Sequence, residues 1–287
     1  MITANTHDIP LKSAAGLIHI PAGVSRSEVT EIRLRSGRRA CVVTIGGRCV
    51  PCSDVLSRED IESCFQELCR HSVHSFSREI AEGYITLPGG HRVGFCGTAV
   101  IKNGALDTLR DISCVNIRIA RQIKGCAEEL FRTVFSHGTC SLLLAGAPLS
   151  GKTTMLRDLA RLLGEKHRVA LIDSRSELAA VYRGTPALDV GENTDVLCGY
   201  PKYEGIMTAL RTLSPEVIIC DEIGGDADAV KQCMHCGVKL IASAHAGSLK
   251  ELSLRPDTAE LLPLFDCAAV LGSGGRLAEL QRNGDTA

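Results

Sequence analysis

The chain has 287 residues, which is enough for one large domain or for two domains of ordinary size, each with its own core. Apolar residues make up 45% of the chain and charged residues 23%, a composition that excludes a fibrous or disordered protein. The 32 Lys and Arg residues nearly balance the 33 Asp and Glu residues, giving a net charge of -1. No global basic field therefore holds the protein on nucleic acid or anionic lipid.

The sequence contains no segment that predicts a membrane span. The longest apolar runs, Leu142 to Ala145 and Cys267 to Leu271, fall far short of the roughly 20 residues that cross a bilayer. The first ten residues lack the basic start and apolar core of a signal peptide. We expect a cytoplasmic protein.

Fourteen cysteines are present, and many lie in apolar runs where a free thiol packs as a small hydrophobic group. Two C-x-x-C pairs, Cys49/Cys52 and Cys233/Cys236, would together supply four thiolates for zinc, although about 180 residues separate them. We expect buried free thiols, with metal binding as the alternative.

Residues 1–125 predict a small α+β domain. The segment from Glu31 to Arg35 alternates, so that Ile32 and Leu34 share one face of a strand. Residues 59–70 carry apolar side chains at helical spacing. The other predicted elements are a strand at 40–45, a hairpin of 84–86 with 92–100, a second hairpin closed at 103–104, and a last strand that buries Val115, Ile117 and Ile119.

Residues 126–287 predict an α/β domain with a parallel sheet, because continuous apolar strands alternate with helices. The predicted strands are 141–145, 168–173, 217–221 and 239–244, and the predicted helices are 126–138, 153–163 and 227–236. Residues 1–125 hold 16 Lys/Arg and 12 Asp/Glu, a charge of about +4, and residues 126–287 hold 16 and 21, about -5. Docking between domains or subunits and a merely solvated surface both explain this imbalance.

The segment from Gly146 to Thr153 fits the pattern G-x-x-x-x-G-K-[ST] directly after a strand and at the start of a helix. Glycines let successive backbone N–H groups curl around a phosphate, and the helix N-terminus adds unpaired donors and the positive end of its dipole. Lys152 is expected to reach the β- and γ-phosphates and the Thr153 hydroxyl to bind Mg²⁺. A chance string in a turn is the alternative. The residues predicted to bind ATP are Gly146, Ala147, Pro148, Leu149, Ser150, Gly151, Lys152, Thr153 and Thr154.

The segment from Val217 to Glu222 is an apolar strand that ends in two acids, the form of a Walker B segment. We predict that Asp221 holds Mg²⁺ and that Glu222 polarises the attacking water. The next strand delivers His245 to the same sheet edge, where it would sense the γ-phosphate. Asp173 ends another strand, and two alternatives remain open there: helix capping by Asp173 or Ser174, and a role near the water or Mg²⁺. Capping is also the alternative for the other strand-end residues.

Three arginines are candidates for a positive charge supplied to the nucleotide of a neighbouring subunit, namely Arg211, Arg118 and Arg121. Such a guanidinium offsets transition-state charge and would make hydrolysis depend on assembly. A surface or structural role is the alternative for each.

With these residues, the sequence resembles the stage III sporulation protein AA family, a branch of the secretion-type ATPases in the AAA-like, RecA-like P-loop group. The resemblance covers nearly the whole chain. It depends on residues 31–35, 83–94 and 116–121 together with the P-loop, the Walker B segment and the pair Ala244-His245. The glycine-rich segment 83–94 is more specific than the P-loop, which any NTPase could share.

The resemblance implies a RecA-like P-loop NTPase domain preceded by a smaller α+β domain, with ATP and Mg²⁺ as ligands. It implies a cytoplasmic ATPase in the mother cell of an endospore-forming bacterium, similar to the motors of type II and type IV secretion systems. A homo-oligomer, expected as a hexameric ring, would act at the membrane with the membrane-bound stage III proteins of the channel into the forespore.

The chain departs from the family pattern at two places. It reads Asp173-Ser174-Arg175 where the family resembles Asp-Glu-Arg, which removes one acid near the water. The tetracysteine zinc element of many secretion ATPases is absent as a compact motif. Its absence weakens the analogy between this chain and those ATPases in how they transmit force.

Two other functions remain open. A nucleotide-dependent scaffold would bind ATP with little turnover and serve as a platform for membrane partners. A nucleic-acid-stimulated ATPase is the third hypothesis, and the aromatic content of 6 Phe, 4 Tyr and no Trp argues against it.

Overall fold

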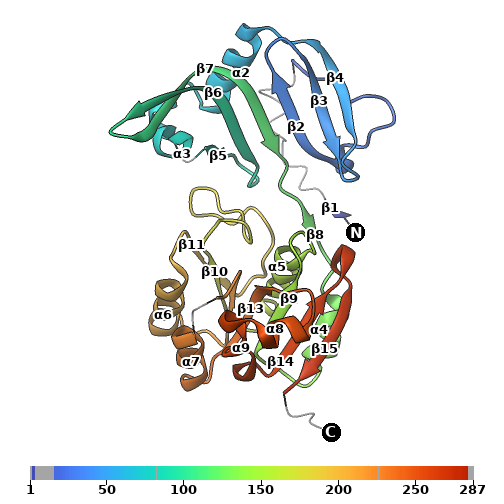
Figure 1. Ribbon diagram of the computed structural model, residues 1–287, viewed down its shortest axis with the longest axis vertical. Helices are drawn as coiled ribbons and strands as arrows, with labels where there is room; N and C mark the ends of the chain where they lie inside the picture. Colours follow the sequence, from blue (N-terminus) through green and yellow to red (C-terminus); the bar gives the residue numbers. More distant parts are fainter. Residues whose placement is uncertain (1, 4–15, 82, 225–226, 284–287) are drawn as a thin grey trace. The chain divides into compact units, whose positions relative to one another are not determined.

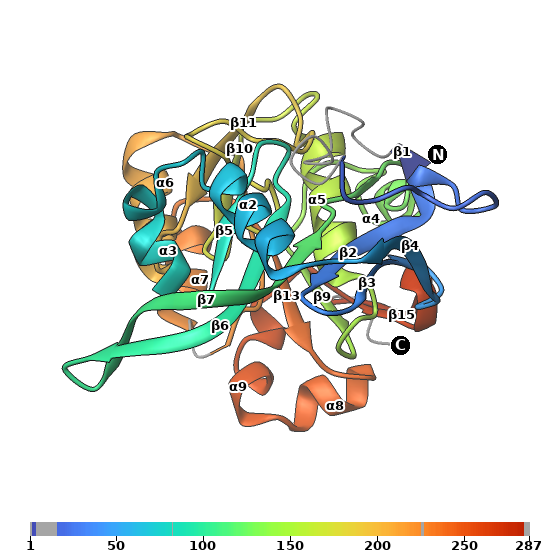
Figure 2. The same cartoon turned by 90° about the horizontal axis from the view of Figure 1, so that it is seen from above.

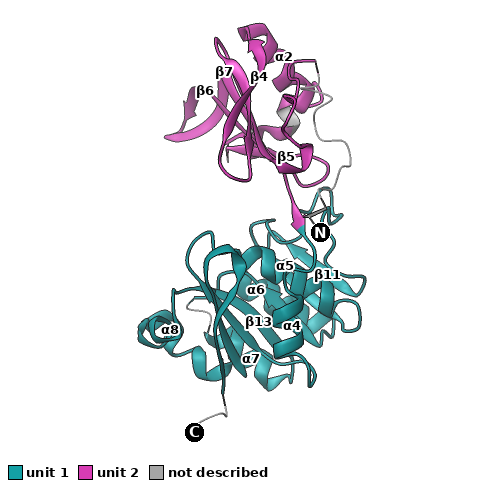
Figure 3. Ribbon diagram, turned by 90° about the vertical axis from the view of Figure 1, so that its right-hand side faces the viewer, with its two compact units in different colours: residues 1, 123–287 teal, residues 2–122 magenta. Residues whose placement is uncertain are grey.

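The computed structural model describes residues 2–3, 16–81, 83–224 and 227–283. The chain forms two compact units, residues 2–122 and the part from Ile123 onward (Figure 3). The sequence prediction placed this boundary at Gly125. A short ladder of two strands, β1 (Ile2–Thr3) and β8 (Gln122–Ile123), is separate from the two large sheets.

The N-terminal unit is built on a six-stranded antiparallel sheet with the strand order β4-β3-β2-β7-β6-β5. Both predicted hairpins are confirmed, one between β5 and β6 and one between β6 and β7. The tip of the long β6–β7 hairpin projects away from the rest of its sheet (Figures 1 and 2). The strands are β2 (Val29–Arg35), β3 (Arg39–Thr44), β4 (Cys49–Val55), β5 (Tyr84–Thr86), β6 (Arg92–Lys102) and β7 (Ala105–Arg118).

The core of this unit lies between one face of the sheet and its helices. Alternation along β2 buries Ile32 and Leu34 and leaves Arg33 exposed, as the sequence predicts. The predicted helix 59–70 is α2 (Arg58–Leu68), which starts at a capping box formed by Ser57 and Asp60. Its buried side packs against the sheet with α3 (Ser77–Ala81), while the single turns η1 (Arg26–Glu28) and η2 (Val73–Phe76) complete the unit.

The C-terminal unit contains a seven-stranded sheet with the order β11-β10-β12-β13-β9-β14-β15. All pairs are parallel except the last, because β15 runs antiparallel to β14. The four predicted strands are confirmed, and three further strands were not predicted. The strands are β9 (Leu142–Gly146), β10 (Val169–Asp173), β11 (Thr194–Cys198), β12 (Val217–Cys220), β13 (Lys239–His245), β14 (Cys267–Leu271) and β15 (Leu277–Arg282).

Helices cover both faces of this sheet (Figure 1), so alternate residues of each central strand enter different cores. Leu142 and Leu144 of β9 pack with α4 and α5, while Leu143 and Ala145 pack with α6, α7 and α8. The helices are α4 (Glu128–Val134), α5 (Lys152–Leu163), α6 (Lys202–Thr212), α7 (Ala227–His235), α8 (Leu249–Leu254), α9 (Pro256–Ala259) and the short turns η3 (Leu262–Leu264) and η4 (Ser273–Gly275). Within the described ranges, no helix combines the length and apolar character that a membrane span requires.

The topology brings three predicted motifs to one place. Strands β12, β13 and β9 are parallel neighbours, with Cys220 opposite Ala242 and Ala244 opposite Ala145. Their carboxyl ends therefore lie at the same edge of the sheet, where ligands bind in open α/β folds.

Candidate active site

The loop between β9 and α5 has the backbone of a phosphate-binding turn. Gly151 lies in the left-handed region with φ of 98° and directly precedes the helix. At Gly146 an added Cβ would lie 2.3 Å from the Ser150 hydroxyl oxygen and 3.3 Å from the carbonyl oxygen of Leu271, so a larger residue there would displace the Ser150 side chain. Leu149 is also left-handed, with φ of 64°, and its side chain is fully exposed. The sequence pattern does not reveal this strained conformation of a leucine.

Lys152 is folded into the loop that it follows. Its ammonium donates to the carbonyl oxygens of Gly146, at 2.8 Å, and Ala147, at 3.0 Å, and lies 3.2 Å from Nδ1 of His245. The residue is 6% exposed, and burial lowers the pKa of Lys152 although the charges of Asp221 and Glu222 act in the opposite direction. The cation thus sits at the centre of the loop, next to the strand-end histidine.

Asp221 is held by two hydroxyl groups. The Thr153 hydroxyl donates to its Oδ2 at 3.1 Å, and the Ser243 hydroxyl donates to its Oδ1 at 2.5 Å. Thr153 is the second residue of α5 and Asp221 follows β12, so residues 68 positions apart in the sequence meet at one point.

Glu222 lies next to Asp221 in a left-handed conformation, with φ of 47°. Its Oε1 is 3.0 Å from Nε2 of His245 and its Oε2 is 2.8 Å from the guanidinium of Arg175. Lys202 donates to its backbone carbonyl oxygen. Burial tends to raise the pKa of Glu222, but the hydrogen bond to His245 and the charge of Arg175 outweigh burial and lower it. The carboxyl group is therefore ionised at neutral pH.

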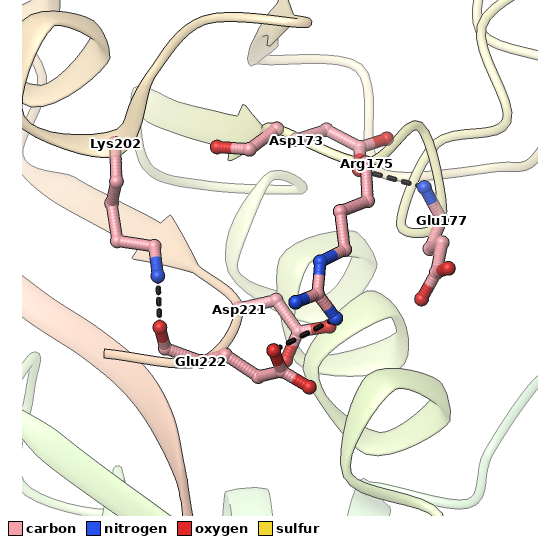
Figure 4. Close-up of a pocket in the computed structure, with 7 residues that line it drawn as sticks. Asp173, Arg175, Glu177, Lys202, Asp221 and Glu222 are labelled. Atoms are coloured by element: carbon pink, nitrogen blue, oxygen red, sulfur yellow. Dashed lines mark hydrogen bonds and ion pairs between the residues drawn. The ribbon is translucent and has the colours of Figure 1, made fainter. Parts of the chain in front are cut away.

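Two cavities share these acids. The larger has a volume of about 360 Å³ and the smaller about 120 Å³. Figure 4 shows the smaller one, with Arg175 and Lys202 reaching Glu222 from two sides. The larger cavity is lined by Pro148, Leu149, Gly151, Lys152, Thr153, Thr154, Asp221, Glu222 and His245. The smaller is lined by Asp173, Ser174, Arg175, Glu177, Lys202, Asp221 and Glu222.

The residues around the larger cavity fit a Mg²⁺-bound nucleoside triphosphate. The hydroxyl of Thr153 and the carboxylate of Asp221 are oxygen ligands of the kind that Mg²⁺ prefers. The hydroxyl of Ser150 is buried and finds no hydrogen-bond partner among the described residues, which suits a loop that receives acceptor oxygens. The loop, the lysine and the two acids thus supply donors, positive charge and metal ligands to one space.

Asp173 has a structural role in this arrangement. Its carboxylate is buried and accepts backbone N–H groups from Glu177, Leu178 and Ala179 at 2.8 to 3.1 Å. The side chain of Arg157, from α5, donates to the carbonyl oxygens of Glu177 and Leu178. No helix lies within the described residues 174–193, so helix capping is not the role of Asp173, whose carboxylate instead fixes the loop after β10. A role near the water or Mg²⁺ stays a prediction.

The three candidate arginines lie outside both cavities. Arg211 is exposed near the end of α6 and donates from Nε to the carbonyl oxygen of Met207 at 3.0 Å. In the N-terminal unit, Arg118 lies 3.4 Å from Glu31 and Arg121 donates to the carbonyl oxygen of Ser27. A role for any of them toward the nucleotide of another subunit stays a prediction.

Within the described residues, no disulfide joins any of the fourteen cysteines. Cys49 and Cys52 lie in β4 of the N-terminal unit, whereas Cys233 lies in α7 and Cys236 follows it in the C-terminal unit. Among the residues that the structure describes, no group of three or more His, Cys, Asp or Glu side chains is arranged to hold a metal ion. Burial raises the pKa of the Cys52 thiol to about 11 and that of Cys233 to about 12, so these thiols are protonated at neutral pH.

Sequence reasoning assigned no role to three residues of the site, namely Arg175, Lys202 and Ser243. Ser243 carried a visible signal, since it is a polar residue inside the apolar strand β13. Arg175 also carried a signal, since it matches the last residue of the family pattern Asp-Glu-Arg. Lys202 carried none, because a charged residue at a helix start is usually solvated.

Comparisons with known proteins identify the family and the fold of this chain. The family described as sporulation stage III, protein AA, matches residues 17–282. Stage III sporulation protein AA of Bacillus subtilis (strain 168) is 40% identical over 242 residues, which cover 82% of this chain and 78% of that protein.

Among solved structures, the ATPase DotB of Yersinia pseudotuberculosis matches with a TM-score of 0.58 and 15% identity, over 93% of this chain and 82% of that one. The pilus retraction motor PilT with bound ADP matches with a TM-score of 0.56 and 14% identity, over 90% and 80% of the two chains. At these identities the likeness shows the fold, which is the RecA-like fold of secretion ATPases preceded by a smaller α+β domain.

Proposed function

Because the chain belongs to the stage III sporulation protein AA family, we propose that it binds and hydrolyses ATP as a motor or assembly ATPase. One observation carries the proposal: the P-loop lysine, the Walker B acids and the strand-end histidine line the same cavity. Fold alone does not imply an activity, but this set of side chains has the chemistry that phosphoryl transfer to water requires.

The roles follow from the chemistry of each group. The loop N–H groups and Lys152 bind the phosphates, and Thr153 with Asp221 holds Mg²⁺, which supplies charge neutralisation when bound. Glu222 is ionised and accepts a hydrogen bond from the attacking water. His245 contacts both Lys152 and Glu222, so it couples the phosphate-binding side of the cavity to the water-binding side.

The biological setting is also part of the proposal. We place the protein in the mother-cell cytoplasm of an endospore-forming bacterium, as a homo-oligomer in a hexameric ring with peripheral attachment to membrane-bound stage III proteins. The family relationship supports sporulation, and the fold shared with the ATPase DotB and with the PilT retraction motor supports a motor ATPase.

Substitution of the P-loop lysine tests the proposal. Lys152→Ala should abolish nucleotide binding or turnover, because among the described residues that line the larger cavity Lys152 is the only lysine or arginine. Lys166→Ala, at an exposed position after α5, is the matched control and should behave as wild type. ATP binding and hydrolysis by purified Lys152→Ala at wild-type levels would refute the P-loop assignment.

A scaffold with little turnover is the second candidate. It is favoured by the pairing of both carboxylate oxygens of Glu222, one with His245 and one with Arg175, which leaves the acid engaged within its own chain. The rate of hydrolysis by the purified protein, alone and with its membrane partners, separates a motor from such a scaffold.

A further inference from the structure

We infer that Ser243 is a positioning residue that sets both Walker B acids with a single buried hydroxyl. The inference rests on the proposed function, since it assigns how that same site orients its metal ligand and its catalytic base. It names a residue of the neighbouring strand β13, not of the segment that carries the acids.

Ser243 is a polar residue in the buried part of strand β13. It is fully buried, and its neighbours on β13 are the apolar Ala242 and Ala244, which face the core formed with α6, α7 and α8. Because side chains alternate along a strand, Ser243 points to the opposite face, as does His245 two residues later. A hydroxyl buried there is costly unless both its donor and its acceptor functions are used.

Both functions are used on consecutive residues. The Ser243 oxygen accepts the backbone N–H of Glu222 at 2.9 Å, and its single proton is donated to Oδ1 of Asp221 at 2.5 Å. The backbone carbonyl of Ser243 also accepts the N–H of Ile223 at 2.7 Å. One residue thus holds three successive positions just beyond the end of β12.

The first consequence concerns Asp221. Since Oδ1 is occupied by Ser243, the other oxygen, Oδ2, is the one directed at the Thr153 hydroxyl. The two candidate Mg²⁺ ligands therefore face each other because the carboxylate is fixed from behind. Partners that orient a metal ligand in this way typically change metal affinity or activity by about 10- to 100-fold when removed.

The second consequence concerns Glu222. A non-glycine residue with a left-handed backbone persists only where its surroundings hold it. The hydrogen bond from its N–H to Ser243 holds this conformation, and the side chain then reaches His245 and Arg175. Loss of the hydroxyl would release the backbone that aims the catalytic base.

The chain offers a matched control for a purely structural role. Ser141 is another buried serine whose hydroxyl accepts a backbone N–H, that of Leu240 at 3.1 Å. It lies before β9, at the opposite end of the strands from the acids. Removing its hydroxyl should affect stability without reaching the site.

The experiment compares Ser243→Ala, Ser141→Ala and wild type by ATP affinity with Mg²⁺, ATP affinity in EDTA, and kcat. The Mg²⁺ gain is the ratio of the ATP affinity with Mg²⁺ to the ATP affinity in EDTA. For Ser243→Ala we expect this gain to fall by about 10- to 100-fold and kcat to fall by a similar factor, while the ATP affinity in EDTA stays unchanged. Ser141→Ala should match wild type in all three, and Ser243→Thr, which keeps the hydroxyl, should retain the Mg²⁺ gain. If Ser243→Ala fails to fold, Ser243→Cys, a weak donor, takes its place with the same expectation.

Two outcomes overturn the inference. A Mg²⁺ gain and kcat at wild-type level in Ser243→Ala would show that the hydroxyl does not position the acids. Equal losses with and without Mg²⁺ would show a general structural role. In both cases wild-type hydrolysis leaves the proposed function standing, whereas a wild-type protein that binds no ATP overturns the proposed function and the inference together.

Discussion

Glu222 combines three properties that an ordinary surface acid lacks. Its backbone is left-handed, its carboxyl pKa is lowered despite burial, and each carboxylate oxygen has a cationic or imidazole partner. A base of low pKa accepts a proton only weakly, so its expected contribution is to orient and polarise water rather than to take the proton fully. This fits hydrolysis of a phosphate, in which positioning outweighs covalent assistance.

Glu222→Gln isolates the charge of this residue. The amide keeps the shape and one acceptor, so ATP affinity should stay near the wild-type value, while kcat should fall by about 10²- to 10⁴-fold. A phosphate-release assay measures kcat, and equilibrium titration with ATP measures the affinity. Glu204→Gln, at an exposed position in α6, serves as the control.

The result in cells separates the two candidate functions. A strain that carries Glu222→Gln should fail to sporulate if the protein works as a motor. Normal sporulation together with lost turnover would instead support the scaffold.

At this scale the sequence predicts the residues whose spacing encodes their role. The P-loop pattern and the strand ending in Asp221 and Glu222 are each contiguous in the sequence, so the sequence alone predicts a nucleotide site formed by them. Three further side chains reach the acids from other elements: Ser243 from β13, Arg175 from the loop after β10, and Lys202 from the start of α6. Their roles depend on strand order, which no local pattern contains.

The strands of the C-terminal sheet are also tied together at the end opposite the site. Asp266, just before β14, accepts the backbone N–H of Ser141 at 2.7 Å and the Lys239 ammonium at 2.9 Å. These residues precede or begin three adjacent strands, β14, β9 and β13. Burial tends to raise the pKa of Asp266, but these two donors outweigh burial and lower it.

This ion pair predicts an acid-sensitive contribution to stability. Because the folded pKa lies below the unfolded value of about 3.9, the contribution is fully present above that value and is lost as pH falls through the folded pKa. Asp266→Asn should therefore lower the free energy of unfolding at pH 7, and the difference from wild type should shrink below about pH 4.

Urea unfolding between pH 7 and pH 3 measures this difference. Tyrosine fluorescence reports mainly on the C-terminal unit, since three of the four tyrosines, Tyr182, Tyr200 and Tyr203, belong to it. Asp195→Asn, exposed on β11, is the control. A deficit in Asp266→Asn that stays constant across the pH range would contradict the assignment.

Elements were predictable where their burial pattern was strong. The central strands β9, β10 and β12 are buried throughout, so their apolar runs stand out in the sequence. The edge strands β11 and β15 are mostly half-exposed and carry charged residues, so they resemble loops. The chain between β10 and β11 was also unpredictable, because it has no regular burial pattern and Arg157, which helps to fix it, belongs to the preceding helix α5.

At the scale of the whole molecule, the candidate site lies in the C-terminal unit, and the arginine expected to complete it does not line the cavity of its own chain. Arg211 is exposed on the surface of α6, and its Nε donates a hydrogen bond to the carbonyl oxygen of Met207. If a neighbouring subunit provides this charge, each active site belongs to two chains. Hydrolysis would then depend on assembly, as it does where an arginine is supplied in trans.

Mixing two inactive variants tests this arrangement. Arg211→Ala should lower kcat far more than ATP affinity, and Lys152→Ala should bind no ATP. In a mixed ring, a site with the loop of an Arg211→Ala chain and the arginine of a Lys152→Ala chain is intact. Random mixing in equal amounts makes such interfaces about a quarter of the total, so activity should reappear in the mixture although each variant alone has none.

Arg132 provides the control, because it also is an exposed arginine whose Nε donates to a carbonyl oxygen one helical turn earlier, that of Glu128. Arg132→Ala should retain full turnover, and all variants should show the wild-type mass in solution with ATP and Mg²⁺. If the mixture stays inactive while the subunits demonstrably co-assemble, Arg211 acts within its own chain, and the shared site is refuted. Restored activity can arise only from a site shared between subunits, because neither chain carries both intact groups.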